Sequence, residues 1–197
     1  MHKPYFAIGQ IYHVYNRGVE KRTIFQNNGD YFRFIHDLFE FNDEQPVIPI
    51  NSRFALAKPS TLKPAQLAQS LEVEPLKIKP LPRRKRKLLV EILAFCLMPN
   101  HFHLLLRQKA ENGIPLFMQK LGTGYTMSFN KKYERVGPLF QGSFKAVAVD
   151  KDVYFSHLPF YIHANPVELV APNWHKEGIK DMGKVKDFLE EIGRAHV

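Results

Sequence analysis

The sequence predicts an α+β domain in which helices pack on an antiparallel sheet. Strand-like and helix-like segments alternate along the chain, and a Pro-Asn turn joins two adjacent strand-like segments. Hydrophobic residues make up 45% of the 197 residues, which is enough for a packed core. These observations favour one domain that carries an insertion.

The first predicted strand lies in GQIYHVYNRG, where Ile11, His13 and Tyr15 share one face and a turn follows. The next segment, NNGDYFRFIHDLFEF, is expected to form a helix. Its apolar residues, Phe34 among them, recur at helical spacing, and Asp30 is a suitable N-cap.

A proline-rich, basic segment interrupts the domain. Seven of the fourteen prolines lie between Pro46 and Pro82, and the segment ends in PRRKRK. Such a composition is typical of an insertion or linker. The last seven residues of the chain, EIGRAHV, back-translate to a sequence that reads like a sequencing adapter, so we interpret them as an assembly artefact. The expected divisions are a single domain in residues 1–42 and 88–170, the insertion in 43–87, a C-terminal extension in 171–190 and the artefact in 191–197.

The second half of the domain supplies the remaining elements. KLLVEILAFCLMPNHFHLLLR predicts a hairpin with strands near 88–97 and 101–107. PLFMQKLGTGYTMSFNKKYERVG predicts an amphipathic helix that Gly122 and Gly124 weaken. A strand in SFKAVAVD and a helix around Pro159 complete the order strand, helix, two strands, helix, strand, helix. This order is that of a ferredoxin-like sandwich.

The charge of the chain narrows the class of its partner. A net charge of +9 and a pI near 9.6 favour a polyanion, either nucleic acid or an anionic membrane surface. A membrane role is disfavoured, because no apolar run approaches about 20 residues and no basic amphipathic helix is evident. The N-terminus does not resemble a signal peptide, and the single Cys96 is expected to be buried in a reducing compartment.

Two histidines in the predicted hairpin are candidate metal ligands. His101 and His103 are two residues apart in a strand, so they share a face and either bind one ion or form a half-exposed edge pair. Tyr161 and Asn165 are four residues apart on one helical face, and Pro166 predicts that the helix ends there. The amide of Asn165 either completes a His-His-Asn site or simply caps the helix.

These motifs together resemble a known family. MPNHFHLL is similar to the His-hydrophobic-His signature of the HUH nucleases. YIHANPV resembles the Tyr-x-x-x-Asn-Pro element of the REP-associated tyrosine transposases, which are bacterial relatives of the single-tyrosine insertion-sequence transposases. YHVYNRGVEKRTIF and SFNKKYERVGPLFQGSFK also match, in the order of the family, over most of residues 9–170 outside the insertion.

The resemblance implies the HUH nuclease fold and metal-dependent cleavage and strand transfer of DNA. Tyr161 would attack a phosphodiester to give a 5′-phosphotyrosyl intermediate, while His101, His103 and Asn165 would bind Mg²⁺ or Mn²⁺. The implied partner is single-stranded or hairpin (REP-like) DNA in the bacterial cytoplasm, and a homodimer is one expected assembly.

Basic and polar side chains near the motifs are expected to contact DNA, although each alone is also typical of a solvated surface. They are Arg17, Lys131, Lys132, Arg135, Gln141 and Lys145. Two alternatives stay open: a domesticated DNA-binding protein that no longer cleaves, and an HUH relaxase or replication initiator. The second group commonly carries a third histidine or a second tyrosine, whereas this chain has Leu105 at the third position.

Overall fold

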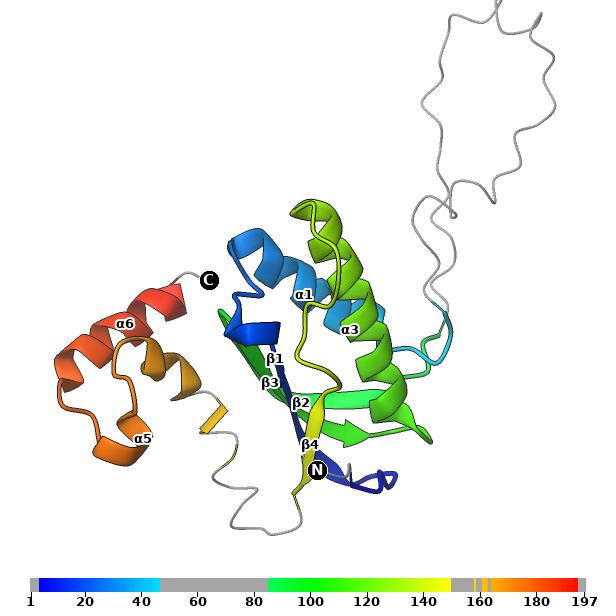
Figure 1. Ribbon diagram of the computed structural model, residues 1–197. Helices are drawn as coiled ribbons and strands as arrows, with labels where there is room; N and C mark the ends of the chain where they lie inside the picture. The colour runs from blue at the N-terminus through cyan, green and yellow to red at the C-terminus, as the bar shows by residue number, and fades with distance from the viewer. Residues whose placement is uncertain (1–3, 47–84, 150–157, 159–160, 163, 195–197) are drawn as a thin grey trace, which may run out of the picture.

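The computed structural model describes residues 4–46, 85–149, 158, 161–162 and 164–194. Within them, one antiparallel sheet has the strand order β2-β3-β1-β4 (Figure 1). Its strands are β1 (Ile11–Arg17), β2 (Val90–Met98), β3 (His101–Gln108) and β4 (Lys145–Ala148). The helical segments are η1 (Val19–Lys21), α1 (Asn28–Glu40), α3 (Gly113–Lys132), η3 (Asn165–Leu169), α5 (Trp174–Glu177) and α6 (Met182–Arg194).

The order of these elements confirms the predicted α+β fold class. Strand β1 lies between β3 and β4, and every neighbouring pair is antiparallel. The chain therefore follows β1-α1-β2-β3-α3-β4, which is the ferredoxin-like arrangement. None of the described helices is long and apolar enough to cross a membrane.

The sheet is covered on both faces. Tyr12 and Val14 of β1 belong to a large core beneath α1 and α3, which lie together on one side (Figure 1). On the other side, Leu105 of β3 packs in a smaller core with Leu158 and Ile162. Because Leu158 and Ile162 flank Tyr161 in the chain, this second core holds the tyrosine segment against the face that carries the odd-numbered residues of β1 and β3.

Helix α1 begins differently from the sequence prediction. Asn27, not Asp30, is the N-cap residue. Asp30 lies in the first turn, where its carboxylate accepts backbone hydrogen bonds from Gln26 at 2.8 Å and Asn27 at 3.3 Å. The prediction was wrong by three residues because an acidic residue is favoured at two places in a capping box, at the N-cap and at the third helical position, where its carboxylate accepts from the N–H of the N-cap.

Helix α3 continues through both of its central glycines. A Cβ atom at Gly124 would lie 2.2 Å from Cζ of Phe41, whereas one at Gly122 would meet nothing within 4 Å. Gly124 therefore allows the Phe41 ring to pack against the helix. The expected weakness is overcome by tertiary packing, because the buried face of α3 belongs to the large core.

The two described ends of the predicted insertion lie side by side. The backbone N–H of Glu44 donates to the carbonyl of Lys87 at 2.9 Å, and Lys120 of α3 donates to the carbonyl of Gln45, also at 2.9 Å. This pairing fits a segment that leaves and re-enters one domain at a single point. The insertion itself, like the predicted helix turn at Pro159, lies mostly outside the described residues.

Candidate functional site

The two histidines of the hairpin share one face of the sheet, as their spacing predicts. His101 begins β3 opposite Arg17 of β1, and His103 lies opposite Tyr15. The two imidazole rings have centroids 5.1 Å apart and are nearly perpendicular, with an interplanar angle of 87°. His103 is 9% exposed and His101 is half-buried, so the pair lies at the boundary between the small core and solvent.

The turn before β3 positions the first imidazole. Nδ1 of His101 lies 2.6 Å from Oδ1 of Asn100. The residue after β1 holds the backbone of this turn, because the N–H of Gly18 donates to the carbonyl of Asn100 at 2.8 Å. An amide oxygen only accepts hydrogen bonds, so Nδ1 of His101 is the donor and Nε2 keeps its lone pair.

The second imidazole is held by a histidine from the neighbouring strand. Nδ1 of His103 lies 2.9 Å from Nε2 of His13, and the two rings stack with centroids 5.1 Å apart. His13 is 6% exposed. In both His101 and His103, therefore, Nδ1 is engaged within the protein, and Nε2 is the nitrogen left to bind a ligand.

Burial keeps these imidazoles neutral. Burial, together with smaller contributions from the neighbouring His13 and His101, lowers the pKa of His103 to about 3. Burial also lowers the pKa of His13 to about 4. The pKa of His101 is lowered chiefly by burial, a shift that the carboxylate of Glu168 opposes and Arg17 reinforces. Neutral imidazole is the form that binds metal ions, so the pair is prepared for a cation at neutral pH.

Tyr161 lies beside this pair within the same chain. Its ring centroid is 6.0 Å from that of His103, at an interplanar angle of 82°. The tyrosine side chain is 42% exposed, whereas its neighbour Ile162 is fully buried in the small core. The segment is thus anchored by apolar contacts and presents the phenol at the surface next to the histidines.

Asn165 follows one turn later and is 3% exposed. Its Nδ2 donates to the backbone carbonyl of Tyr161 at 2.8 Å. The side chain therefore caps this turn through its nitrogen, while Oδ1 accepts no hydrogen bond from the described residues. The capping and the ligand interpretations are compatible, because they use different atoms of one amide.

The donor set suits a hard or borderline divalent cation. Among the residues that the structure describes, no group of three or more His, Cys, Asp or Glu side chains could hold a metal ion. The predicted set requires only two imidazoles, His101 and His103, and takes its third ligand from the amide oxygen of Asn165. Mixed nitrogen and oxygen donors of this kind accept Mg²⁺ or Mn²⁺.

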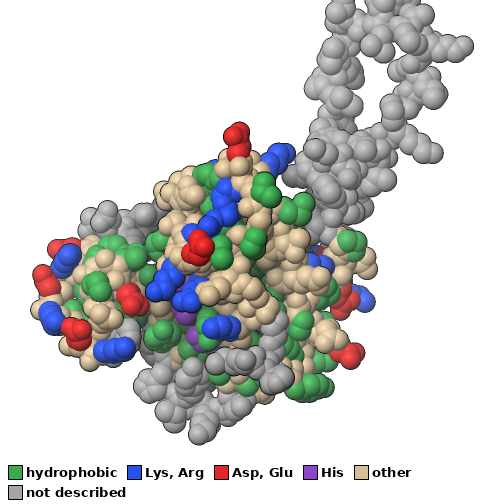
Figure 2. Space-filling view, in the orientation of Figure 1, with side chains coloured by type: hydrophobic (Ala, Val, Ile, Leu, Met, Phe, Trp, Pro, Cys, Tyr) green, Lys and Arg blue, Asp and Glu red, His purple; other side chains and the backbone are tan. Residues whose placement is uncertain are grey.

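Three of the predicted DNA-contacting residues lie at the edge of this site. Arg17 donates through Nε to Oε1 of Gln141, and the N–H of Gln141 returns a bond of 2.8 Å to the carbonyl of Arg17. Lys145 of β4 lies opposite Tyr15, so it is on the face that carries the histidines. Figure 2 shows Lys and Arg side chains gathered around the visible histidine surface.

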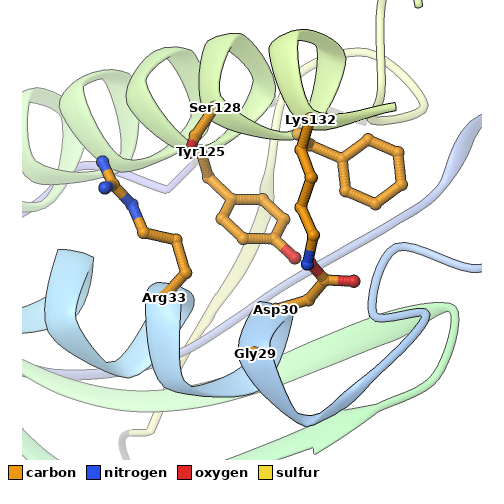
Figure 3. A pocket seen from close by; sticks show the side chains of 7 residues that line it. Gly29, Asp30, Arg33, Tyr125, Ser128 and Lys132 are labelled. Atoms are coloured by element: carbon orange, nitrogen blue, oxygen red, sulfur yellow. The ribbon is translucent and has the colours of Figure 1, made fainter. Parts of the chain in front are cut away.

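The other three predicted DNA-contacting residues lie at or just after the end of α3, on the side of the sheet opposite the histidines. Lys131 is exposed, and Arg135 donates to Oδ1 of Asn130 at 2.8 Å. Lys132 is 2.6 Å from the carboxylate of Asp30, in a hollow between α1 and α3 (Figure 3). The structure does not bring these three side chains to the histidine pair, and their contact with DNA stays a prediction.

Sequence reasoning assigned no site role to His13, Tyr15 or Glu168. The alternation in β1 placed His13 and Tyr15 on one face, but it gave no strand partner. The sheet register supplies that partner, since Tyr15 lies opposite His103. Glu168 acts on His101 through its charge, which places η3 beside the site.

Comparisons with known proteins bear on the fold and on the family that the chain resembles. Residues 79–165 match the family model described as "Transposase IS200 like", a segment that includes both histidines, Tyr161 and Asn165. Among solved structures, the fold matches one described as "Structure of the REP associates tyrosine transposase bound to a REP hairpin". That match has a TM-score of 0.51 and 14% identity, and it covers 86% of this chain and 73% of the other. No curated protein matches. The resemblance stated from the sequence is confirmed.

Proposed function

We propose that this chain, which is recognised as an IS200-like transposase and shares the fold of a REP-associated tyrosine transposase, cleaves and rejoins single-stranded DNA beside a hairpin. One observation carries the proposal. The phenol of Tyr161 lies beside two neutral imidazoles whose Nδ1 atoms are already engaged, with the ring centroids of Tyr161 and His103 6.0 Å apart. A nucleophile and a candidate cation site are thus adjacent in one chain.

The reaction that fits these residues is a transesterification. Oη of Tyr161 attacks a phosphorus atom of the DNA backbone, a new O–P bond forms, and the bond to the 3′ oxygen breaks. The products are a 5′-phosphotyrosyl link and a free 3′-OH. Attack by a 3′-OH on that link reverses the chemistry and joins strands, so bond energy is conserved and no nucleotide cofactor is needed.

A phenol is a weak nucleophile at neutral pH, because its ordinary pKa is about 10. A bound divalent cation would polarise the scissile phosphate and stabilise the developing charge. The residues that would hold it are His101 and His103 through Nε2 and Asn165 through Oδ1. The two Nδ1 hydrogen bonds fix the rings in advance, so little reorganisation is required when the cation binds.

Charge and position support a DNA substrate. Arg17, Gln141 and Lys145 lie on or beside the face that carries the histidines, where they would contact phosphates flanking the cleaved bond. The solved structure of similar fold is described as bound to a REP hairpin, which supports a hairpin next to the cleavage site here. We place this activity on cytoplasmic DNA of a bacterium.

The alternatives fit less well. A domesticated DNA-binding protein has no need of a phenol beside two neutral imidazoles, which is how Tyr161 lies next to His103 and His101 here. In a relaxase with a third histidine, position 105 would face the cation, but Leu105 is 1% exposed and belongs to the small core. Because one chain supplies the nucleophile and the candidate ligands, we propose a site completed in cis, whether or not the protein dimerises.

The test is formation of a covalent adduct. The full chain is incubated with Mg²⁺ or Mn²⁺ and a hairpin DNA that carries a single-stranded 5′ flank, and the products are separated on a denaturing gel. We expect a DNA-linked protein band whose digest places the link on Tyr161. Tyr161→Phe should abolish the band while DNA binding persists.

Two controls make this experiment decisive. Tyr5→Phe changes a tyrosine that is 89% exposed, and the adduct should form as in the unmodified protein. The double change His101→Ala with His103→Ala should remove the adduct and keep most DNA binding. An adduct that survives Tyr161→Phe would show that another group is the nucleophile.

A further inference from the structure

His13 is the buried titratable group closest to the site that the proposed chemistry leaves without a role. It lies on β1 diagonally across from His103, because the register pairs His13 with Leu105 and Tyr15 with His103. Among the described residues, its side chain forms one hydrogen bond, the 2.9 Å contact with Nδ1 of His103. A buried histidine whose hydrogen bond points to a predicted metal ligand is placed to act on that ligand.

The packing around the pair leaves little freedom. The His13 and His103 rings stack at 22°, and the ring of Tyr15 lies 5.2 Å from His13 and 5.8 Å from His103. His13 and His103 are 6% and 9% exposed, so water does not readily replace the bond between them. Such a buried polar contact is costly to break, and it fixes the plane of the His103 ring.

Two neutral imidazoles share one proton across this contact, which allows two tautomeric arrangements. If Nε2 of His13 donates, Nδ1 of His103 is the acceptor and the proton of His103 sits on Nε2, where it blocks metal binding. If Nδ1 of His103 donates to Nε2 of His13, the lone pair of His103 is on Nε2 and points away from His13. Only the second arrangement suits a ligand.

We propose that His13 is a positioning residue for the metal site, because its Nε2 accepts the Nδ1 proton of His103 and thereby holds the Nε2 lone pair of His103 ready for the cation. The inference rests on the proposed function, in which His103 is a ligand. His13 then does for His103 what Asn100 does for His101 through the 2.6 Å contact. Partners of this kind typically change metal affinity by about 10- to 100-fold when they are removed.

Paired substitutions at position 13 test the inference. His13→Gln keeps an oxygen that can accept from Nδ1 of His103, whereas His13→Leu fills the space without an acceptor. Mn²⁺ affinity is measured by electron paramagnetic resonance titration of the full chain, with melting temperature as a check of folding. We expect His13→Leu to weaken Mn²⁺ binding about 10- to 100-fold, and His13→Gln to bind within about threefold of the unmodified protein. Equal affinity in the leucine variant, or equal losses in both variants at equal melting temperature, would overturn the proposal.

The tautomer is a second readout that does not depend on activity. In the Mg²⁺-loaded protein, nitrogen-15 NMR of the imidazoles should show His103 protonated on Nδ1. Protonation on Nε2 in that state would refute the inference. His103→Ala is measured alongside: if it leaves Mn²⁺ affinity unchanged, the proposed metal site itself fails, whereas a loss in His103→Ala without one in His13→Leu refutes only the role of His13.

Discussion

The side-chain nitrogen of Asn165 donates a 2.8 Å hydrogen bond to the backbone carbonyl of Tyr161. This bond couples the candidate ligand to the candidate nucleophile, since it fixes the turn that carries both. It also orients the amide, because a nitrogen held against the chain leaves the oxygen to face elsewhere. The two roles of Asn165 can therefore be separated by substitution.

Asn165→Ala should remove both the hydrogen bond to the Tyr161 carbonyl and the proposed metal ligand. Asn165→Asp should remove only the hydrogen bond. The aspartate cannot donate to the Tyr161 carbonyl, so we expect a loss of about 1 kcal/mol in the free energy of unfolding. Its carboxylate should still bind Mn²⁺ at least as well as the amide does. The alanine variant should lose the same stability and weaken Mn²⁺ binding by at least about tenfold. Urea denaturation and Mn²⁺ titration measure the two effects, and similar Mn²⁺ affinity in all three proteins would exclude Asn165 as a ligand.

The two glycines of α3 should respond oppositely to alanine. Gly122→Ala meets nothing within 4 Å and should raise the free energy of unfolding by about 0.5–1 kcal/mol, because alanine has the higher helix propensity. Gly124→Ala places Cβ 2.2 Å from the Phe41 ring and should lower it by about 1–3 kcal/mol. Both changes gain the same helix propensity. The difference between their free energies of unfolding, measured by urea denaturation, therefore reports the steric cost at Gly124. Equal effects would mean that Phe41 moves aside freely.

Asp30 connects the beginning of α1 to the end of α3. Its carboxylate accepts hydrogen bonds from Lys132 at 2.6 Å and from the hydroxyl of Tyr133 at 2.7 Å. Burial alone would raise the pKa of Asp30, but these donors and the N–H of Gln26 outweigh it, so the pKa lies below its ordinary value. The carboxylate therefore stabilises the fold fully above the unfolded pKa, and this contribution is lost as the pH falls through the lower folded pKa.

Asp30→Ala should lower the free energy of unfolding at pH 7 by about 1–3 kcal/mol, because it removes a buried carboxylate that accepts hydrogen bonds from both the backbone before α1 and the end of α3. Lys131→Ala is the matched control, since Lys131 is exposed and adjacent to Lys132. It should change stability by less than about 0.5 kcal/mol. A similar small change for Asp30→Ala would show that solvent readily replaces this network.

Mild acid should destabilise the metal-free protein through its buried histidines. The pKa values of His13 and His103 lie at about 4 and about 3 in the fold, below the ordinary value of 6.5. Between pH 6.5 and the folded pKa values, these histidines are protonated in the unfolded chain but not in the folded chain. The free energy of unfolding therefore falls as the pH falls from 7 toward 4. At pH 5 the loss should be on the order of 2 kcal/mol for each imidazole.

Urea denaturation with EDTA at pH 7 and pH 5 measures this loss. His13→Leu removes one of the two titrating groups and should shrink the difference between the two pH values. Val136→Ala changes a residue that is 95% exposed and carries no titratable group, and the difference should stay as in the unmodified protein. If His13→Leu leaves the pH dependence unchanged, the buried pair is not its cause.

The fold could be predicted from local patterns, whereas the site could be predicted only in part. Alternation in β1 and β3 and the turn at Asn100 fixed which residues share a face. The same patterns could not pair β1 with β3, because contacts between strands distant in the chain leave no local signal. His13 was therefore missed although its face was known. The N-cap of α1 was misplaced for a different, local reason, since a capping box favours an acidic residue at its third helical position as well as at the N-cap.

Salt dependence should separate phosphate contacts from ordinary surface charge. If about five phosphates are contacted, the logarithm of the binding constant for single-stranded DNA should fall with the logarithm of salt concentration at a slope near −3.5. Lys145 lies on the face that carries the histidines, so Lys145→Gln should make that slope shallower by about 0.7. Lys109→Gln is the matched control, because Lys109 is exposed and follows the end of β3 away from His101. Applied to Lys131 and Lys132, the same titration decides whether DNA extends to the end of α3. An unchanged slope for Lys145→Gln would place the DNA path away from β4.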